Sequence, residues 1–518
     1  MTPPNQLLAE SLSHLKSITD AKGLVGIKTA DLGRVHRERL LKNGFIKEVT
    51  KGWYIASNPE ERPGDSTSWY ISYWRFCAEY LQEKYGKDYC LSAEQSLLLY
   101  AGNTTIPHQL IVRSPRGSNA TIELLSGTSL YIMKSPLPGT ADLMDKDGLS
   151  ILTLPSALIH CSPLMYEKFP IEMRTAMALV DDPSDVLRIL LEGSHTTIAG
   201  RLAGGFRNIG QERFADQIIK TMQASGLNAR EEDLFKGATP GKLQARQKSP
   251  YVNRIYLMWE QMRKEIISVF PEAPGIAVDK KRYLDSIDEI YVTDAYHSLS
   301  IEQYTVSAAL IEKVKTGDWD IHDESDRKQR DALAARGYWQ AAQLVKQSIE
   351  RILSGQNPGE VVDMDHSDWY LELFSPNVIA GILKRSDLAG YRSNQVYISN
   401  SLHVPLNKDA VREAMPALFE LLRNEPHAGV RAVLGHFIFV YIHPYMDGNG
   451  RMGRFLLNVM LASGGYPWTV IPVDLRDRYM ASLESASVEG DILPFARYLA
   501  YLVSESLNGR PVAKLKDV

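Results

Sequence analysis

The sequence predicts a protein of several domains that is mainly helical. At 518 residues the chain exceeds the size of one ordinary core. Its 44% hydrophobic and 23% charged residues are typical of a folded globular protein. Patterning changes along the chain, and from about residue 251 it is mainly helical. We therefore expect a small N-terminal domain at 1–60, an α+β domain at 65–235, a linker at 236–250 and a helical domain at 251–510.

Composition excludes several classes of protein. A net charge of −4 gives no whole-chain signal for nucleic acid. The three cysteines, Cys77, Cys90 and Cys161, form no CxxC pair, which favours reduced thiols over disulfides or zinc. The N-terminus has no signal-peptide pattern, and the longest apolar run, 432–442, is too short to cross a bilayer. We expect a cytoplasmic protein without a membrane partner.

Residues 5–56 predict a helix, a short helix, a second helix and a hairpin. In the second helix Leu40 and Leu41 are expected to face inward, and Gly44 to cap the C-terminus. Two short strands are expected to meet at Lys51-Gly52. Between Asp20 and Ala56 there are eight Lys or Arg against four Asp or Glu, a local positive balance that favours phosphate contacts.

This pattern resembles the winged helix-turn-helix that opens AbiEi-type antitoxin regulators. The resemblance implies operator DNA as a partner and a set of DNA-contacting side chains: Arg34, Arg37, Arg39, Lys42, Lys47 and Lys51. The alternative is a winged helix used only for packing or protein contact.

The middle region mixes strand-like runs, QLIVRS and TSLYIM, with helical runs such as SDVLRILLEG. Its stretch from His195 to Gly226 is also similar to AbiEi-like proteins. The segment KGATPGKLQARQKSP then has the Gly, Pro and basic content of a tether.

The segment HPYMDGNGRMGR, from His443 to Arg454, carries the chemistry. Apolar residues at helical spacing precede His443, Pro444 stops that helix, and a second helix follows the DGNG turn. A glycine turn entering a helix N-terminus forms an anion site. Arg451 and Arg454 can face the same polyanion, and Asp447 supplies an oxygen for Mg²⁺. His443 can accept a proton from a hydroxyl.

This segment resembles the Fic motif, HPFx[D/E]GNGRxxR, with Tyr445 in place of Phe, and the resemblance extends over roughly 280–505. It implies ATP as substrate, His443 as the base, Asp447 as the Mg²⁺ ligand and Arg454 at the γ-phosphate. Gly450 is absent from the kinase-like branch, so its presence favours attack at the α-phosphate. The remaining nucleotide-binding residues implied by the motif are Gly448, Asn449, Gly450, Arg451, Met452 and Gly453.

Two accessory elements extend the resemblance. Residues 391–398 alternate like a strand, and together with the following turn they resemble the Fic flap, a β-hairpin that pairs with the target protein. Its nucleotide-facing residues would be Ile398, Ser399 and Asn400; the alternative is an ordinary exposed hairpin. Tyr479 lies where the family has an aromatic near the adenine, although it could equally be a core tyrosine.

Ser298 and Glu302 resemble the inhibitory motif [S/T]xxxE[G/N] of the same family, with Gln303 at the last position. A carboxylate opposite Arg454 would occupy the place of the γ-phosphate. The sequence thus predicts a protein adenylyltransferase restrained by Glu302, with self-modification, homo-oligomers and DNA-binding autoregulation as further expectations. The alternatives are a regulator whose Fic fold senses nucleotide, transfer of another nucleotide-derived group, and removal of AMP.

Overall fold

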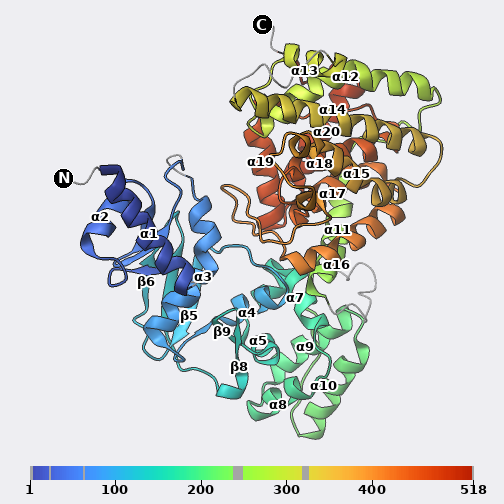
Figure 1. Cartoon of the computed structure of the whole chain (residues 1–518). Coiled ribbons are helices and arrows are strands. Elements are labelled where there is room, and N and C mark those ends of the chain that lie inside the picture. The colour runs from blue at the N-terminus through green and yellow to red at the C-terminus, as the bar shows by residue number, and fades with distance from the viewer. Residues whose placement is uncertain (1–3, 23–24, 62–64, 237–248, 318–325, 516–518) are drawn as a thin grey trace. The chain divides into compact units, whose positions relative to one another are not determined.

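A computed structural model of the chain describes residues 4–22, 25–61, 65–236, 249–317 and 326–515. The chain divides into two compact units (Figure 1). The first comprises residues 1–250 together with 397–404, and the second comprises 251–396 and 405–518. Residues 237–248 of the predicted linker lie outside the described residues.

The first unit begins with two helices and a small antiparallel sheet of order β1-β3-β2. The elements are α1 (Pro4–Lys22), β1 (Ile27–Lys28), α2 (Arg34–Lys42), β2 (Ile46–Thr50) and β3 (Trp53–Ala56). The predicted hairpin and the Gly44 cap are confirmed, since Gly44 has a φ of 74° and its N–H and that of Phe45 bond back to α2. The prediction of a short second helix was wrong. A turn precedes α2 instead, in which the Lys28 N–H donates to the Asp31 side chain. Leu40 is buried as predicted, whereas Leu41 is exposed.

The rest of the first unit combines a four-stranded sheet, a two-stranded sheet and helices. Sheet order is β4-β5-β7-β6, with β5 and β7 parallel, and β8 pairs with β9. The predicted strands QLIVRS and TSLYIM are β5 and β7, and SDVLRILLEG is α8. The bounds are α3 (Thr67–Tyr85), β4 (Cys90–Leu91), α4 (Ala93–Tyr100), β5 (Gln109–Ser114), β6 (Ala120–Glu123), β7 (Ser129–Lys134), β8 (Leu143–Lys146), β9 (Leu149–Leu152), α5 (Leu154–His160), α6 (Leu164–Lys168), α7 (Pro170–Ala178), α8 (Ser184–Glu192), α9 (Thr196–Asn208) and α10 (Glu212–Ala224).

The second unit is helical, and no β-strand occurs in its described part. Its helices are α11 (Pro250–Val269), α12 (Lys280–Ile301), α13 (Ala308–Thr316), α14 (Asp326–Leu353), α15 (Pro358–Ile379), α16 (Lys408–Asn424), α17 (Ala428–Ile442), α18 (Asn449–Ala462), α19 (Arg476–Glu484) and α20 (Leu493–Leu507). Short helical turns η2 (Arg385–Leu388), η3 (Val473–Leu475) and η4 (Ser485–Glu489) join them. Both α17 and α18 are almost entirely buried among the other helices (Figure 1), as their apolar sequences require.

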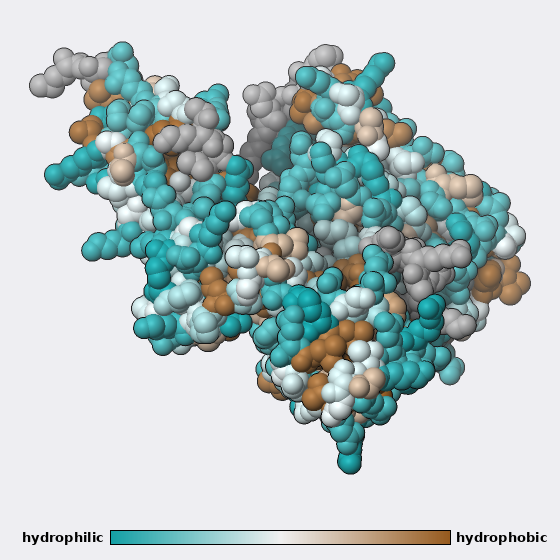
Figure 2. Space-filling view, turned by 90° about the horizontal axis from the view of Figure 1, so that it is seen from below, coloured by the Kyte–Doolittle hydropathy of each residue, from teal (hydrophilic) through white to brown (hydrophobic). Residues whose placement is uncertain are grey.

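The surface of the molecule is mainly polar on the face in Figure 2, where hydrophobic residues form small separate groups. Among the described helices, none combines the length and the hydropathy that a membrane crossing requires. The three cysteines are free thiols. Burial raises the pKa of Cys90 to about 11, which keeps it protonated at neutral pH.

Candidate active site

The end of α17 and the start of α18 frame the site. The apolar run of α17 continues until His443, which takes the left-handed conformation with φ 55° and ψ 61°. Pro444 cannot extend the helix, and four residues later Gly448 turns the chain with a φ of 80°. A Cβ at Gly448 would lie 2.8 Å from the Phe374 ring, so glycine is required there by both conformation and space. Helix α18 begins at Asn449, inside the predicted turn.

His443 is held in the tautomer that a general base needs. Its Nδ1 lies 3.1 Å from the carbonyl oxygen of Val440, and only a protonated Nδ1 can donate to that oxygen. In the neutral ring Nε2 therefore keeps its lone pair. Burial lowers the pKa of His443 to about 4, so the ring is neutral across the physiological range.

The turn is stabilised by the Asn449 side chain. Its Oδ1 accepts from the Tyr445 N–H at 2.9 Å, and its Nδ2 donates to the Tyr445 carbonyl at 2.8 Å. Tyr445 stacks on Tyr370 with ring centroids 3.7 Å apart, so the aromatic body at this position packs as expected. Asn449 thus shapes the turn, and the donors left for phosphate are backbone N–H groups at the start of α18.

Two guanidinium groups lie beneath this turn. Arg451 is 1% exposed and Arg454 is 4% exposed. Arg451 lies over the rings of Phe374 and Tyr304, with its Cζ 4.9 and 5.3 Å from their centroids. Among the described residues, Arg451 Nε and Arg454 Nη1 have no hydrogen-bond partner. Buried guanidinium nitrogens without acceptors are rare, and they mark a place where an anion can bind.

Glu302 and Ser298 meet Arg454 directly. Arg454 Nη2 donates to Glu302 Oε1 at 2.7 Å, and Nε donates to Ser298 Oγ at 2.8 Å. A Cβ built on Gly450 would lie 2.3 Å from Glu302 Oε1, so the carboxylate sits against the first turn of α18. It therefore occupies the helix N-terminus where an anionic ligand would bind.

The Glu302 side chain is ionised in this position. Burial alone raises the pKa of the carboxyl, but the Arg454 and Arg451 guanidinium groups more than offset burial and hold the pKa below its usual range. The same pairing raises the pKa of Arg454 against the opposing effect of burial. The two side chains form an ion pair at neutral pH.

The backbone beside Glu302 takes a conformation that favours particular residue types. Helix α12 ends in a Schellman motif, in which Tyr304 N–H donates to Leu299 and Gln303 N–H to Ser300. Gln303 has a φ of 66°, the left-handed conformation that favours Gly or Asn. The departure at Gln303 therefore places strain in the turn that aims Glu302.

Asp447 is suited to hold a metal shared with phosphates. Its side chain is 68% exposed, with Oδ1 accepting from the Gly448 N–H at 2.6 Å and Oδ2 3.5 Å from Arg451. One carboxylate beside a phosphate cradle is the protein contribution that Mg²⁺ commonly uses, since phosphates and waters complete the octahedron. The residues present thus fit Mg²⁺.

Three of the residues predicted to contact the nucleotide are buried: Met452, Gly453 and Tyr479. Met452 is buried in α18, and a Cβ at Gly453 would lie 2.8 Å from Val440, so Gly453 permits close packing with α17. Tyr479 is 1% exposed, and its hydroxyl lies 2.8 Å from His436 Nε2. Tyr479 also interacts with Arg454, so it lies beside the site, and its contact with adenine stays a prediction.

The predicted β-hairpin flap was wrong. No strand forms in residues 391–404; Arg392 N–H donates to the Pro444 carbonyl and Ser401 N–H to Ile398 instead of forming a ladder. Residues 397–404, which include Ile398 and Ser399, belong to the first unit.

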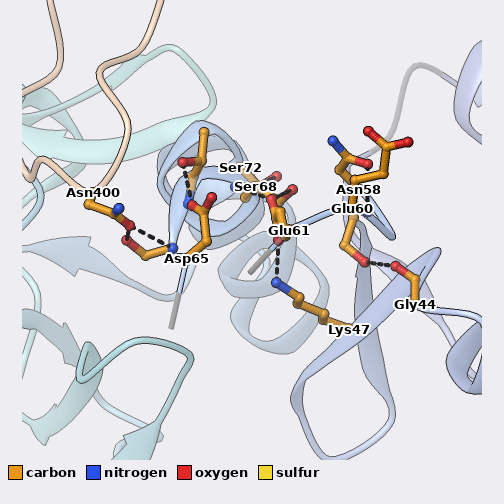
Figure 3. Close-up of polar contacts among 12 residues, drawn as sticks. Gly44, Lys47, Asn58, Glu60, Glu61, Asp65, Ser68, Ser72 and Asn400 are labelled. Carbon is orange, nitrogen blue, oxygen red and sulfur yellow. Dashed lines mark hydrogen bonds and ion pairs between the residues drawn. The ribbon is translucent and has the colours of Figure 1, made fainter. Parts of the chain in front are cut away.

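Within that unit Asn400 Oδ1 accepts from the Ser66 N–H at 3.2 Å, as the dashed lines in Figure 3 show. The Leu402 carbonyl accepts from the Ile106 N–H at 3.0 Å. Leu402 and Val404 pack against the apolar core that α3 forms with the larger sheet. This segment is fixed by tertiary contacts rather than by a hairpin.

Several of the predicted DNA-contacting side chains have partners within their own unit. Arg39 Nη1 donates to the Leu7 carbonyl at 2.8 Å and to Ser11 Oγ at 2.7 Å, which ties α2 to α1. Lys47 pairs with Glu61 (Figure 3), and Arg34 pairs with Glu38 at 2.7 Å. In the described part of the chain, no ion pair involves Arg37, Lys42 or Lys51.

Sequence reasoning missed three residues of the site: Tyr304, Phe374 and Arg392. Tyr304 and Phe374 flank Arg451, and Arg392 donates to the His443 carbonyl at 2.7 Å. Arg392 belongs to a segment that the sequence had singled out, but its partner is 51 residues away and no local spacing indicates it.

Part of the second unit is similar in sequence to known proteins. Residues 367–461 match the Fic/DOC family, and this stretch includes His443, the glycine turn and α18.

Among curated proteins, the chain is 28% identical over 264 residues to protein adenylyltransferase Fic of Drosophila virilis, covering 48% of this chain and 51% of that protein. It is 27% identical over 219 residues to protein adenylyltransferase fic-1 of Caenorhabditis elegans, covering 41% of this chain and 39% of that protein. The chain thus spans about half or less of the length of these relatives. A solved structure, Fic-1 (aa134–508) from C. elegans, covers 67% of this chain and 97% of its own, with 20% identity and a TM-score of 0.37.

Proposed function

We propose that the second unit is a protein adenylyltransferase that moves AMP from ATP to hydroxyl side chains of target proteins, and that Glu302 restrains it. The observation that carries this proposal is the placement of a neutral His443 beside a glycine turn under which two guanidinium groups are buried. The similarity to curated protein adenylyltransferases supports ATP as the substrate.

In the reaction, Nε2 of His443 would take the proton of the target hydroxyl as its oxygen attacks the α-phosphorus. The new O–Pα bond forms as the bond from Pα to the bridging oxygen breaks, and pyrophosphate leaves. The first N–H groups of α18, with Arg451 and Arg454, would hold the phosphates. When bound through Asp447, Mg²⁺ would neutralise phosphate charge.

The restraint follows from the position of the Glu302 carboxylate. It pairs with Arg454 and lies against Gly450, at the start of α18. Two anions cannot share this place without strong repulsion, so ATP would bind with its phosphates displaced or displace Glu302 first. Replacing Glu302 with glycine should raise transfer roughly tenfold to hundredfold, as loss of a charge-assisted hydrogen bond allows.

The test incubates the full chain and its Glu302→Gly variant with Mg²⁺ and ATP labelled at the α- or γ-phosphate, and measures labelled protein. Retention of the α-label alone, increased in the variant, supports AMP transfer and the restraint. Retention of the γ-label would overturn the chemistry. Retention of neither label in the presence of added host proteins would favour a nucleotide sensor, and transfer from UTP or CDP-choline would favour another group.

AMP removal is the second reaction that this site could perform. The same Glu302 carboxylate could position a water near a modified hydroxyl if Arg454 released it. Release of AMP from pre-labelled protein by the unmodified chain, absent in Glu302→Gly, would support this second reaction.

We also propose, separately, that the N-terminal segment binds DNA. Its support is the α1–β1–α2–β2–β3 order and the basic side chains that remain outside ion pairs in the described region, Arg37, Lys42 and Lys51. Binding of duplex DNA at low salt tests it, and no binding at 50 mM salt would leave the segment a protein-contact or packing domain.

A further inference from the structure

Arg392 is buried at the base of the 391–396 segment without an acidic partner in the described part of the chain. It is 2% exposed, and its guanidinium donates to three carbonyls: His443 at 2.7 Å, Asn394 at 2.9 Å, and Leu406. Burial lowers the pKa of Arg392 to about 10, and no carboxylate offsets this. An unpaired buried cation is costly, so its contacts need a purpose that a neutral side chain would not serve.

The contacts of Arg392 fix one particular peptide. The side chain binds the carbonyl of His443, and the backbone N–H of Arg392 donates to the carbonyl of Pro444 at 2.9 Å. Two consecutive carbonyls, on either side of Pro444, are therefore held by one residue. His443 is in the left-handed conformation, which is unfavourable for a residue with a Cβ, and external contacts are needed to maintain it.

We infer that Arg392 is a positioning residue for the proposed transfer reaction, holding the His443 backbone in the conformation from which its imidazole acts. This inference rests on the proposed function. Arg392 would not touch ATP or the target, and it would act only through His443.

The charge of Arg392 contributes in the same direction as its geometry. The groups that bear on His443 are Arg392, which opposes the imidazolium, Glu302 and Asp447, which favour it, and the Val440 carbonyl. Removing the Arg392 charge should therefore raise the pKa of His443. A lysine would keep the charge but could not donate to three carbonyls in one plane.

The experiment compares Arg392→Gln and Arg392→Lys, each in the Glu302→Gly chain, by kcat and KM for ATP between pH 4 and 8. We expect kcat to fall ten- to hundredfold in both, with KM changed less than twofold. Because protonation inactivates the base, the acid limb should move to higher pH in Arg392→Gln and stay in place in Arg392→Lys. Retention of kcat within twofold in both variants would overturn the inference.

A second readout does not depend on transfer. The His443 pKa is measured by NMR of histidine-labelled protein carrying an intact Glu302, with and without Arg392→Gln. A rise in the pKa supports the inference, and an unchanged pKa together with an unmoved acid limb would reduce Arg392 to a structural residue. If the Glu302→Gly parent transfers no AMP, the proposed function fails, while the NMR result still decides the link between Arg392 and His443. If Arg392→Gln does not fold, the kcat of Arg392→Lys tests the inference: a ten- to hundredfold fall supports it, and a kcat within twofold of the parent overturns it.

Discussion

The start of α18 and the basic helix α2 both present arginines that the sequence assigned to phosphates, and their surroundings differ. Arg451 and Arg454 are buried and retain guanidinium nitrogens without acceptors among the described residues. Arg39 is partly buried, and its guanidinium already binds the Leu7 carbonyl and Ser11. The start of α18 and helix α2 thus share only their positive charge.

The difference teaches that an anion-binding site is recognised by guanidinium groups whose hydrogen-bonding capacity is unmet. Burying a guanidinium is costly unless something accepts its N–H groups, so the open nitrogens of Arg451 and Arg454 beside a helix N-terminus are suited to an anionic ligand. An arginine whose donors are already bound within its own unit stabilises that unit. The four predictions below test this contrast.

The largest expected effect separates chemistry from binding at the α18 site. His443→Ala in the Glu302→Gly chain should lower kcat about 10²- to 10⁴-fold, because the base is lost. ATP affinity by calorimetry should remain unchanged. In the parent chain, transfer should be constant from pH 5 to 8 and fall only at more acidic pH, because burial lowers the pKa of His443 to about 4 in the unmodified chain and loss of the Glu302 charge lowers it further.

The matched control is His427→Ala, at the other end of α17, where the ring caps the helix by accepting from the Val430 N–H. It should cost about 1 kcal/mol of stability and leave kcat intact. Equal loss of kcat in the two variants would mean that the helix, rather than His443, carries the effect.

The second prediction compares the arginines directly. Arg454→Gln in the Glu302→Gly chain should weaken ATP binding roughly tenfold to hundredfold, because a charge-assisted contact to phosphate is lost. Arg39→Gln should leave ATP binding unchanged. Calorimetric titration of both variants with ATP measures the two affinities. An unchanged ATP affinity in Arg454→Gln would contradict the assignment of Arg454, rather than Arg39, to phosphate.

The third prediction concerns α2 and its hairpin. Lys42→Ala and Lys51→Ala should each lower the salt slope of DNA binding by about 1, as expected when one phosphate contact is lost. Arg39→Ala should instead lower the free energy of unfolding by about 1–3 kcal/mol, since it removes contacts between α1 and α2. Anisotropy at several salt concentrations and chemical denaturation measure these. A slope changed most by Arg39→Ala would reverse the assignment.

The smallest effect lies beside Glu302. Gln303→Gly should stabilise the chain by about 1 kcal/mol, because glycine adopts the left-handed conformation without a steric penalty. Gln303→Ala keeps the Cβ and should give no gain. Thermal denaturation of the pair measures the strain at the turn that aims the carboxylate.

Much of the α18 site could be predicted because its residues are close in sequence. The helix that ends at His443, the Pro444 stop and the glycine turn follow from spacing and from residues with restricted backbones. The meeting of Arg454 with Glu302 was predicted by resemblance to a known motif. The same local rules correctly placed the hairpin after α2.

The predictions failed where contacts between residues far apart in the sequence determine the structure. Strand-like alternation in 391–398 did not yield a strand, because the N–H of Arg392 and the residues beyond 397 bind elsewhere in the chain. Local periodicity cannot show such partners, since it records only neighbours along the chain.

The segment 397–404 has a practical consequence for dissecting this protein. Because Leu402 and Val404 complete a core formed by residues far upstream, one cut near residue 250 does not release two self-sufficient fragments. A C-terminal fragment would present these apolar side chains to solvent, and the N-terminal fragment would lack them. Expression of the N-terminal half should therefore improve when the 397–404 segment is supplied in trans, and expression of the C-terminal half when that segment is replaced by a short polar loop.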